Sequence, residues 1–144
     1  MRLLTLTSAL ATALLAGCGL FRPGPPEYDA IELPSGLLVR DLVEPDGGEP
    51  ARAGDTVAVH YELFLADRTL IESSAKSGLP LRFELGSGEV PRGLDEGIVG
   101  MRLFGRRRLT VPSLLAFGPE GRPPEIPPHA TVVFDVELME LQAR

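Results

Sequence analysis

The stretch that decides the fold runs from residue 126 to residue 138 and reads IPPHATVVFDVEL. After its prolines, every second residue is apolar, namely Val132, Phe134, Val136 and Leu138. Side chains two residues apart lie on the same face of a strand, so this spacing gives one element an apolar face and a polar face. The stretch predicts a β-strand over Thr131–Leu141 with its apolar face in the core.

A second stretch, from Thr56 to Leu65, shows the same alternation. Its apolar positions are Val57, Val59, Tyr61 and Leu63, and we expect the two apolar faces to meet in the core of one sheet. Further strands are predicted at Leu37–Val43, Leu81–Leu85 and Leu103–Val111. The Gly, Pro and Asp residues between these segments favour an antiparallel arrangement.

One short helix is predicted after Pro91, a residue that suits the first helical turn because its missing N–H has no partner there in any case. Leu94, Ile98 and Met101 fall at positions i, i+4 and i+7, which gives the helix an apolar stripe to lay against the sheet. A sheet with one packed helix predicts the α+β fold class.

The first residues differ from the rest of the chain. Arg2 precedes an apolar run from Leu3 to Ala16, which has the length of a signal peptide and is too short to span a bilayer as a mature helix. The run closes on Leu15-Ala16-Gly17-Cys18, which resembles the lipobox of bacterial lipoproteins. We therefore expect residues 1–17 to be a signal peptide and Cys18 to carry lipid. The alternative is an ordinary signal peptide with an incidental cysteine.

Residues 18–34 are rich in proline and lack a hydrophobic period, so they are predicted to be a spacer after the lipidated cysteine. Residues 35–144 then form one domain, in keeping with the 144-residue length of the chain. We expect a protein exported and lipid-anchored to a bacterial cell-envelope membrane. Leu20 is not the Asp associated with inner-membrane retention, which favours the periplasmic side or the outer membrane. The oligomeric state stays open, with a monomer expected.

The charge of the chain argues against nucleic acid as a partner. Without the predicted leader, the chain keeps 13 basic and 20 acidic residues, a formal net charge of −7. Its one basic cluster, Arg106-Arg107-Arg108, lies between apolar residues and is predicted to be the solvated part of a strand.

Conventional catalytic and metal-binding sets have little support. His60 and His129 are the only histidines, and neither stands in a pattern typical of a metal site. Gly86-Ser87-Gly88 is predicted to be a turn and Ser73-Ser74 a polar loop, since neither has the strand-to-helix pattern around a nucleophilic serine. We therefore expect no metal and no cofactor.

A series of short motifs follows in order along the chain. They are VHY at 59–61, ESS at 72–74, FELG at 83–86, VPRGLDEG at 90–97, LTVP at 109–112, AFG at 116–118 and the stretch at 126–138. In order and spacing they resemble the FKBP family of peptidyl-prolyl cis-trans isomerases. The resemblance implies a twisted antiparallel half-barrel sheet curled around one short helix, with an apolar proline-binding pocket between them.

The resemblance also implies which residues act on X-Pro bonds in proline-containing polypeptide clients. The catalytic set would be Tyr61, Glu72, Phe83, Phe117, Ile126 and Phe134. The rest of the substrate pocket would be Ile71, Leu81, Val90, Pro91 and Leu94. No nucleophile is needed, because a dry pocket favours the twisted amide, which has lost the charge separation that water stabilises.

Several positions depart from the family pattern. Leu94 replaces the usual Trp, Glu72 the usual Asp, Phe117 the usual Tyr and Pro91 a common Ile, while Ile71 and Leu81 replace aromatic residues. Proline has no N–H and phenylalanine no hydroxyl, so two hydrogen-bond donors are missing from the expected pocket.

Three functions remain open from the sequence. The first is an isomerase that assists the folding of exported proteins. The second is a weakly active or inactive FKBP-like domain that binds client or partner proteins, which the two missing donors favour. The third, a purely structural lipoprotein, leaves the retained pocket positions unexplained.

Overall fold

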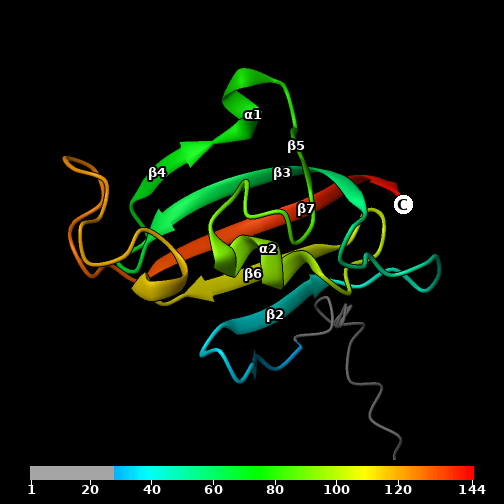
Figure 1. Cartoon of the computed structure of the whole chain (residues 1–144), viewed down its shortest axis with the longest axis horizontal. Helices are drawn as coiled ribbons and strands as arrows, with labels where there is room; N and C mark the ends of the chain where they lie inside the picture. Colours follow the sequence, from blue (N-terminus) through cyan, green and yellow to red (C-terminus); the bar gives the residue numbers. More distant parts are fainter. Residues whose placement is uncertain (1–27) are drawn as a thin grey trace, which may run out of the picture.

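The computed structural model describes residues 28–144, which form one antiparallel sheet with short helices (Figure 1). The strands are β1 (Ile31–Glu32), β2 (Leu38–Val43), β3 (Thr56–Leu65), β4 (Leu70–Ser73), β5 (Leu81–Glu84), β6 (Arg106–Val111) and β7 (Val132–Gln142). The helices are α1 (Ser74–Ser77), α2 (Arg92–Ile98) and the 3-10 helix η1 (Ser113–Leu115). This arrangement confirms the α+β fold class.

The strand order is β1-β2-β6-β7-β3-β4, with β5 also paired to β3. β3 and β7 pair along most of their length, and Tyr61 lies opposite Val136 while Leu63 lies opposite Phe134. Residues opposite each other in a ladder share a face, so the alternating apolar positions of both strands meet in one layer. This confirms the expected core.

The free edge of β3 is divided between two partners. Its first half, Thr56 to Val59, pairs with β5, and the second half, from Glu62, pairs with β4. The chain between these strands, which contains α1, leaves the sheet where they part (Figure 1). Tyr61 lies at that gap, and the site described below forms around it.

α2 lies across the concave face of the sheet (Figure 1). Leu94 and Ile98 are buried there with Met101, just beyond the helix end, as the apolar stripe predicts. They pack into a core that includes Val57, Leu109 and Leu138 of the sheet and Leu37 just before β2, each 0% exposed.

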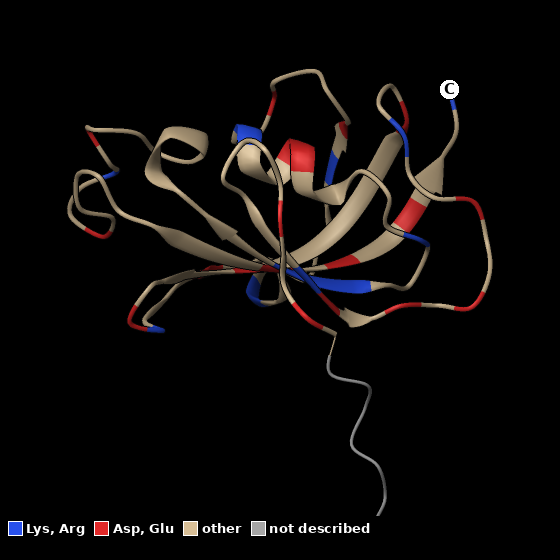
Figure 2. Ribbon diagram, turned by 90° about the horizontal axis from the view of Figure 1, so that it is seen from below, with Lys and Arg blue, Asp and Glu red and all other residues tan. Residues whose placement is uncertain are grey.

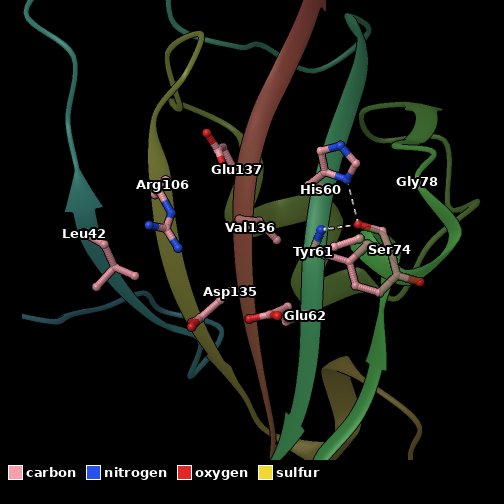
Figure 3. Close-up of a pocket in the computed structure, with 11 residues that line it drawn as sticks. Leu42, His60, Tyr61, Glu62, Ser74, Gly78, Arg106, Asp135, Val136 and Glu137 are labelled. Atoms are coloured by element: carbon pink, nitrogen blue, oxygen red, sulfur yellow. Dashed lines mark hydrogen bonds between the residues drawn. The ribbon is translucent and has the colours of Figure 1, made fainter.

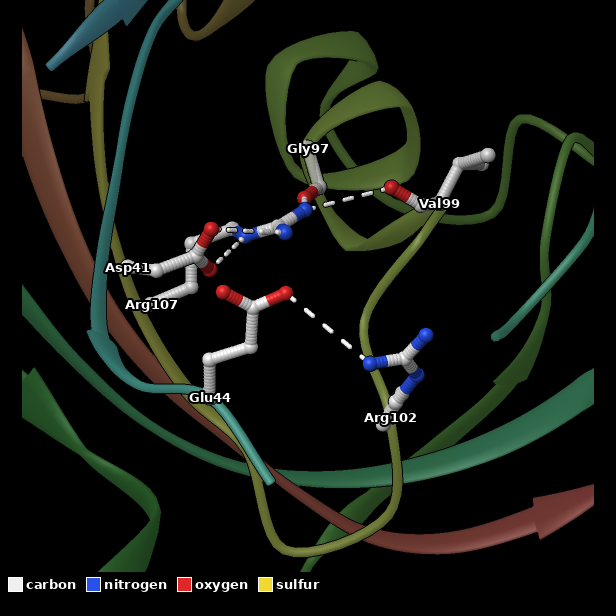
Figure 4. A network of polar contacts seen from close by, with 6 residues as sticks. All are labelled: Asp41, Glu44, Gly97, Val99, Arg102 and Arg107. Atoms are coloured by element: carbon white, nitrogen blue, oxygen red, sulfur yellow. Dashed lines mark hydrogen bonds and ion pairs between the residues drawn. The ribbon is translucent and has the colours of Figure 1, made fainter. Parts of the chain in front are cut away.

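The arginine run lies in a strand with Arg106 exposed, as predicted, but Arg107 departs from the prediction because its side chain is only 13% exposed. Arg107 faces the helix side, where its Nη1 donates to the carbonyls of Gly97 and Val99 at the end of α2 and its Nε donates to Asp41 (Figure 4). Arg108 makes two 2.7 Å hydrogen bonds to Asp135, which raise the pKa of its guanidinium. Figure 2 shows acidic residues interspersed with the basic ones, as these pairs require.

Other differences from the sequence prediction are local. β6 begins at Arg106 instead of Leu103, because Leu103 and Phe104 lie in a turn where Phe104 has φ 67°. β1 adds a short strand inside the predicted spacer, and β4 with α1 was not predicted. The signal peptide and Cys18 lie outside the described residues. Within residues 28–144, no helix is long and apolar enough to cross a bilayer.

Candidate functional site

The structure gathers the residues of the expected pocket on one side of the sheet. Phe83, Leu94, Ile126 and Phe134 are fully buried in the core. Packed against this core, and partly exposed, are Tyr61, Ile71, Leu81, Val90 and Phe117. The ring of Tyr61 lies 6.2 Å from that of Phe134, tilted by 55°. Apolar and aromatic surface therefore reaches from the core to solvent at Tyr61 and Phe117.

The backbone at Tyr61 explains why this residue is so firmly held. Its N–H has no strand partner where β5 and β4 part, and it donates instead to the hydroxyl oxygen of Ser74 at 2.9 Å. The same hydroxyl lies 3.0 Å from Nδ1 of His60. Ser74 is buried, with 6% of its surface exposed. It is therefore a structural bridge from α1 to β3 and not the polar loop residue that the sequence predicted.

A chain of polar contacts leads from Tyr61 to the rim. The Tyr61 hydroxyl donates to Glu72 Oε1, and Arg122 donates from Nη2 to Glu72 Oε2 at 3.1 Å. Burial, followed by the hydrogen bond to Glu72, raises the pKa of Tyr61 to about 12. The guanidinium carbon of Arg122 lies 5.1 Å from the centre of the Phe117 ring, within cation–π range. Tyr61, Glu72 and Phe117 are thus joined through Arg122.

The loop from β5 to α2 carries Val90 and Pro91, and Asp95 fixes it. The carboxylate of Asp95 accepts hydrogen bonds from the backbone N–H groups of Gly86 at 2.7 Å and Gly88 at 3.3 Å. This confirms the predicted turn at Gly86–Gly88, where both glycines have positive φ. Pro91 precedes the helix and its carbonyl accepts from the N–H of Leu94 at 2.9 Å. Its place at the helix start is as predicted.

Two hollows border this region on different sides. One, of about 520 Å³, contains Tyr61, Glu72 and Leu81 of the expected set, together with Ser73, Ser74, Lys76, Ser77, Leu79 and Pro80. The other, of about 420 Å³, lies over the polar face of the sheet and shares only Tyr61 with that set (Figure 3). Its walls include His60, Glu62, Arg106 and Glu137. The first hollow contains three residues of the expected set and the second only one, so the first lies nearer the candidate site, although Phe117, Ile126 and Phe134 line neither.

The chemistry available here is that of an apolar surface with a polar rim. Within residues 28–144, no group of three or more His, Cys, Asp or Glu side chains is arranged to hold a metal ion. Buried aromatic and aliphatic side chains would exclude water from an apolar ring placed against them, and exclusion of water lowers the barrier to twisting an amide. The roles of individual residues in such a reaction stay predictions.

Three participants escaped the sequence prediction. Arg122 lies in a Gly-Arg-Pro-Pro segment without a recognisable pattern, Ser74 is predicted to lie in a polar loop, and Asp95 has no assigned role. The bonds of Ser74 and Asp95 to the backbone depend on which loops fold against them.

Comparisons with known proteins match this geometry. A family model described as FKBP-type peptidyl-prolyl cis-trans isomerase covers residues 47–139. A protein named FK506-binding protein from Neisseria meningitidis serogroup C is 43% identical over 105 residues, which are 73% of this chain and 95% of that protein. FK506-binding protein 4 of Dictyostelium discoideum is 44% identical over 114 residues, 79% of this chain but 30% of that much longer protein.

Among solved structures, FkpA from Escherichia coli superposes with a TM-score of 0.70 and 36% sequence identity. The match covers 78% of this chain and 51% of the FkpA chain.

Proposed function

The chain belongs to the FKBP-type peptidyl-prolyl cis-trans isomerase family, and we propose that it acts on exported proteins by binding X-Pro segments in the apolar site around Tyr61. Isomerisation of an X-Pro bond takes tens to hundreds of seconds without a catalyst, slow enough to limit folding. An isomerase placed where exported chains fold would shorten that step.

The observation that carries this proposal is the continuity of apolar surface from the core to the rim. Phe134 and Ile126 are 2% and 0% exposed in the core, and Tyr61 and Phe117 pack against that core while remaining partly exposed. A proline ring that binds to this surface is removed from solvent, and the amide bond that precedes it is removed from solvent as well. Leu79 lines the hollow of about 520 Å³ and is 73% exposed, so it offers additional apolar surface to an unfolded client.

The mechanism follows from the amide. Resonance makes the barrier to rotation ~18–20 kcal/mol, and the planar ground state is more polar than the twisted state. An apolar site therefore destabilises the planar form relative to the twisted one. Hydrogen-bond donors at the rim then hold the flanking carbonyls while the bond turns.

A direct test is isomerisation of a proline tetrapeptide, followed without an added protease so that a sensitive domain is not digested. The proposed function requires catalysis above the spontaneous rate by the wild-type protein, and a competing unlabelled proline peptide should inhibit it. Binding of an unfolded client without any catalysis would favour the alternative, a domain that binds partners through the same surface.

The proposed location depends on Cys18. Replacement by Ser removes the sulfur that would carry the lipid, and acyl chains contribute ~0.8 kcal/mol of membrane affinity per buried CH₂. Cys18→Ser should release the protein from the membrane fraction or leave its leader uncleaved. Unchanged fractionation together with an unchanged mass of the N-terminal peptide would show that Cys18 is not the anchor.

A further inference from the structure

We propose that Arg122 is a substrate-binding residue of this site, donating a hydrogen bond from its guanidinium to a backbone carbonyl oxygen of the bound X-Pro polypeptide. The inference rests on the proposed isomerase function and deepens it, because it names the donor at the rim of the pocket.

The backbone holds Arg122 at a fixed place beside the apolar site. Its N–H donates to the carbonyl of Ile126 at 2.9 Å, and its carbonyl accepts from the N–H of Ile126 at 3.0 Å. Ile126 is 0% exposed and belongs to the core. Gly121, at φ 65°, allows the chain to fold back here, since a Cβ at this position would lie 2.5 Å from the carbonyl oxygens of Ile126 and Pro127. The position of Arg122 is therefore set by core residues.

The side chain is held as well, but most of its donors are spare. Nη2 carries the 3.1 Å bond to Glu72 and lies 3.9 Å from Glu125. A guanidinium has five N–H donors in a planar fork. Within the part of the chain that the structure describes, Nε and Nη1 of Arg122 have no hydrogen-bond partner, and 41% of the side chain is exposed. The group is thus preorganised over Phe117 with N–H bonds left for a ligand.

Three of the expected pocket residues in the described part of the chain have no side-chain or proline-nitrogen donor to offer a ligand. The Tyr61 hydroxyl already donates to Glu72. Pro91 has no N–H, and the Phe117 ring has no hydroxyl. A polypeptide carbonyl that leaves water at this rim without a donor would be left unsatisfied, which is unfavourable. Arg122 can satisfy it from its place above the ring.

The test compares Arg122→Met, which keeps an unbranched apolar side chain and removes every donor, with Arg106→Met as a matched control. Arg106 is exposed on the opposite face of the sheet. Both variants are assayed with a neutral proline peptide, and their melting temperatures are measured to verify folding. We expect kcat/KM to fall about tenfold in Arg122→Met, the value of one lost hydrogen bond, and to stay unchanged in Arg106→Met.

A rescue experiment separates substrate binding from a purely structural role. Phe117→Tyr places a hydroxyl at the same rim, so adding it to Arg122→Met should raise kcat/KM several-fold. The same change in the wild-type protein should raise kcat/KM by a smaller factor. A structural ion pair to Glu72 predicts no such rescue. Two results would overturn the inference while the wild type is active. One is an unchanged kcat/KM in Arg122→Met, and the other is a loss of kcat/KM in Arg122→Met that Phe117→Tyr does not restore. Inactive wild type would instead refute the proposed function itself.

Discussion

Gly93 of α2 lies against Val111 of β6 so closely that a Cβ on Gly93 would stand 2.2 Å from Cγ1 of Val111. Gly97, one turn further along, has the same relationship to Leu109, whose Cδ1 would lie 2.5 Å from such a Cβ. Glycine is unfavourable inside a helix by ~1 kcal/mol relative to alanine. Both glycines are there because they let the helix backbone approach the sheet, and this approach sets the floor of the candidate site.

Gly93→Ala should therefore destabilise the protein although alanine is the better helix former. Val111 is β-branched and 0% exposed, so it cannot turn away easily. Overpacking of this kind costs about 1–3 kcal/mol, which a denaturant titration would measure as a lower midpoint. The control is Gly47→Ala, where a Cβ would have nothing within 4 Å. Equal stability of the two variants would show that the helix can shift without penalty.

Arg107→Met should also destabilise the fold, for an electrostatic reason. The side chains of Arg107 and Asp41 are 13% and 23% exposed, and the arginine also satisfies two carbonyls at the end of α2 (Figure 4). Removing it leaves a mostly buried carboxylate without its partner, so we expect a loss of about 1–3 kcal/mol. Arg106→Met, one residue away on the exposed face, should change the unfolding free energy by less than about 0.5 kcal/mol.

The sequence predicted the features that depend on neighbouring residues and missed those that depend on contacts between distant segments. Alternation along one strand is a local property, so the pairing faces of Val57 and Leu138 could be predicted. So could the helix after Pro91, because its signals lie within ten residues. The contact of Arg107 with α2 and that of Arg122 with Glu72 join separate loops and strands, and no periodicity records them. The sequence contains the arginines, but it does not indicate which partners their side chains contact.

The titration of Tyr61 gives a third prediction. Its pKa is raised to about 12 by burial and by Glu72, while Arg122 acts to lower it. Glu72→Gln should therefore bring the pKa down, and Arg122→Met should push it up. Phenolate absorbance reports it cleanly because the chain has no Trp and only two Tyr, and Tyr61→Phe identifies the Tyr61 contribution. Shifts in the opposite directions would contradict the contacts in the structure.

This shift also has a consequence for stability. The folded protein holds the Tyr61 proton more tightly than the unfolded chain does, whose tyrosine titrates near the ordinary value of about 10. The contribution is complete below that pH and is lost as the pH rises toward about 12. Unfolding free energy should decline through this window less steeply in Tyr61→Phe than in wild type.

Phe134 provides a test of whether a buried aromatic residue also touches substrate. Phe134→Leu is a modest change of core volume and should cost less than about 1.5 kcal/mol of stability. If the ring lines the pocket beside Tyr61, kcat/KM should fall several-fold beyond what the lost stability explains. Leu138→Val, on the same strand face, should lower the melting temperature without this loss. A Phe134→Leu variant with full rate, whatever its melting temperature, would show that Phe134 does not contact the substrate.

The last prediction concerns Pro91, which stands where the resemblance leads one to expect isoleucine and which has no N–H to donate. Pro91→Ile and Pro91→Ala both restore an N–H at the start of α2, but only isoleucine also restores a large apolar side chain. If the missing donor weakens binding, both variants should tighten a proline peptide by about five- to tenfold, since one neutral hydrogen bond contributes ~1 kcal/mol. Each should lose up to about 1 kcal/mol of stability, because proline restricts the unfolded chain. Calorimetry of ligand binding and thermal melting measure the two effects separately. A gain in Pro91→Ile alone would assign the benefit to the side chain, and a gain in neither would show that this N–H does not contact the ligand in this protein.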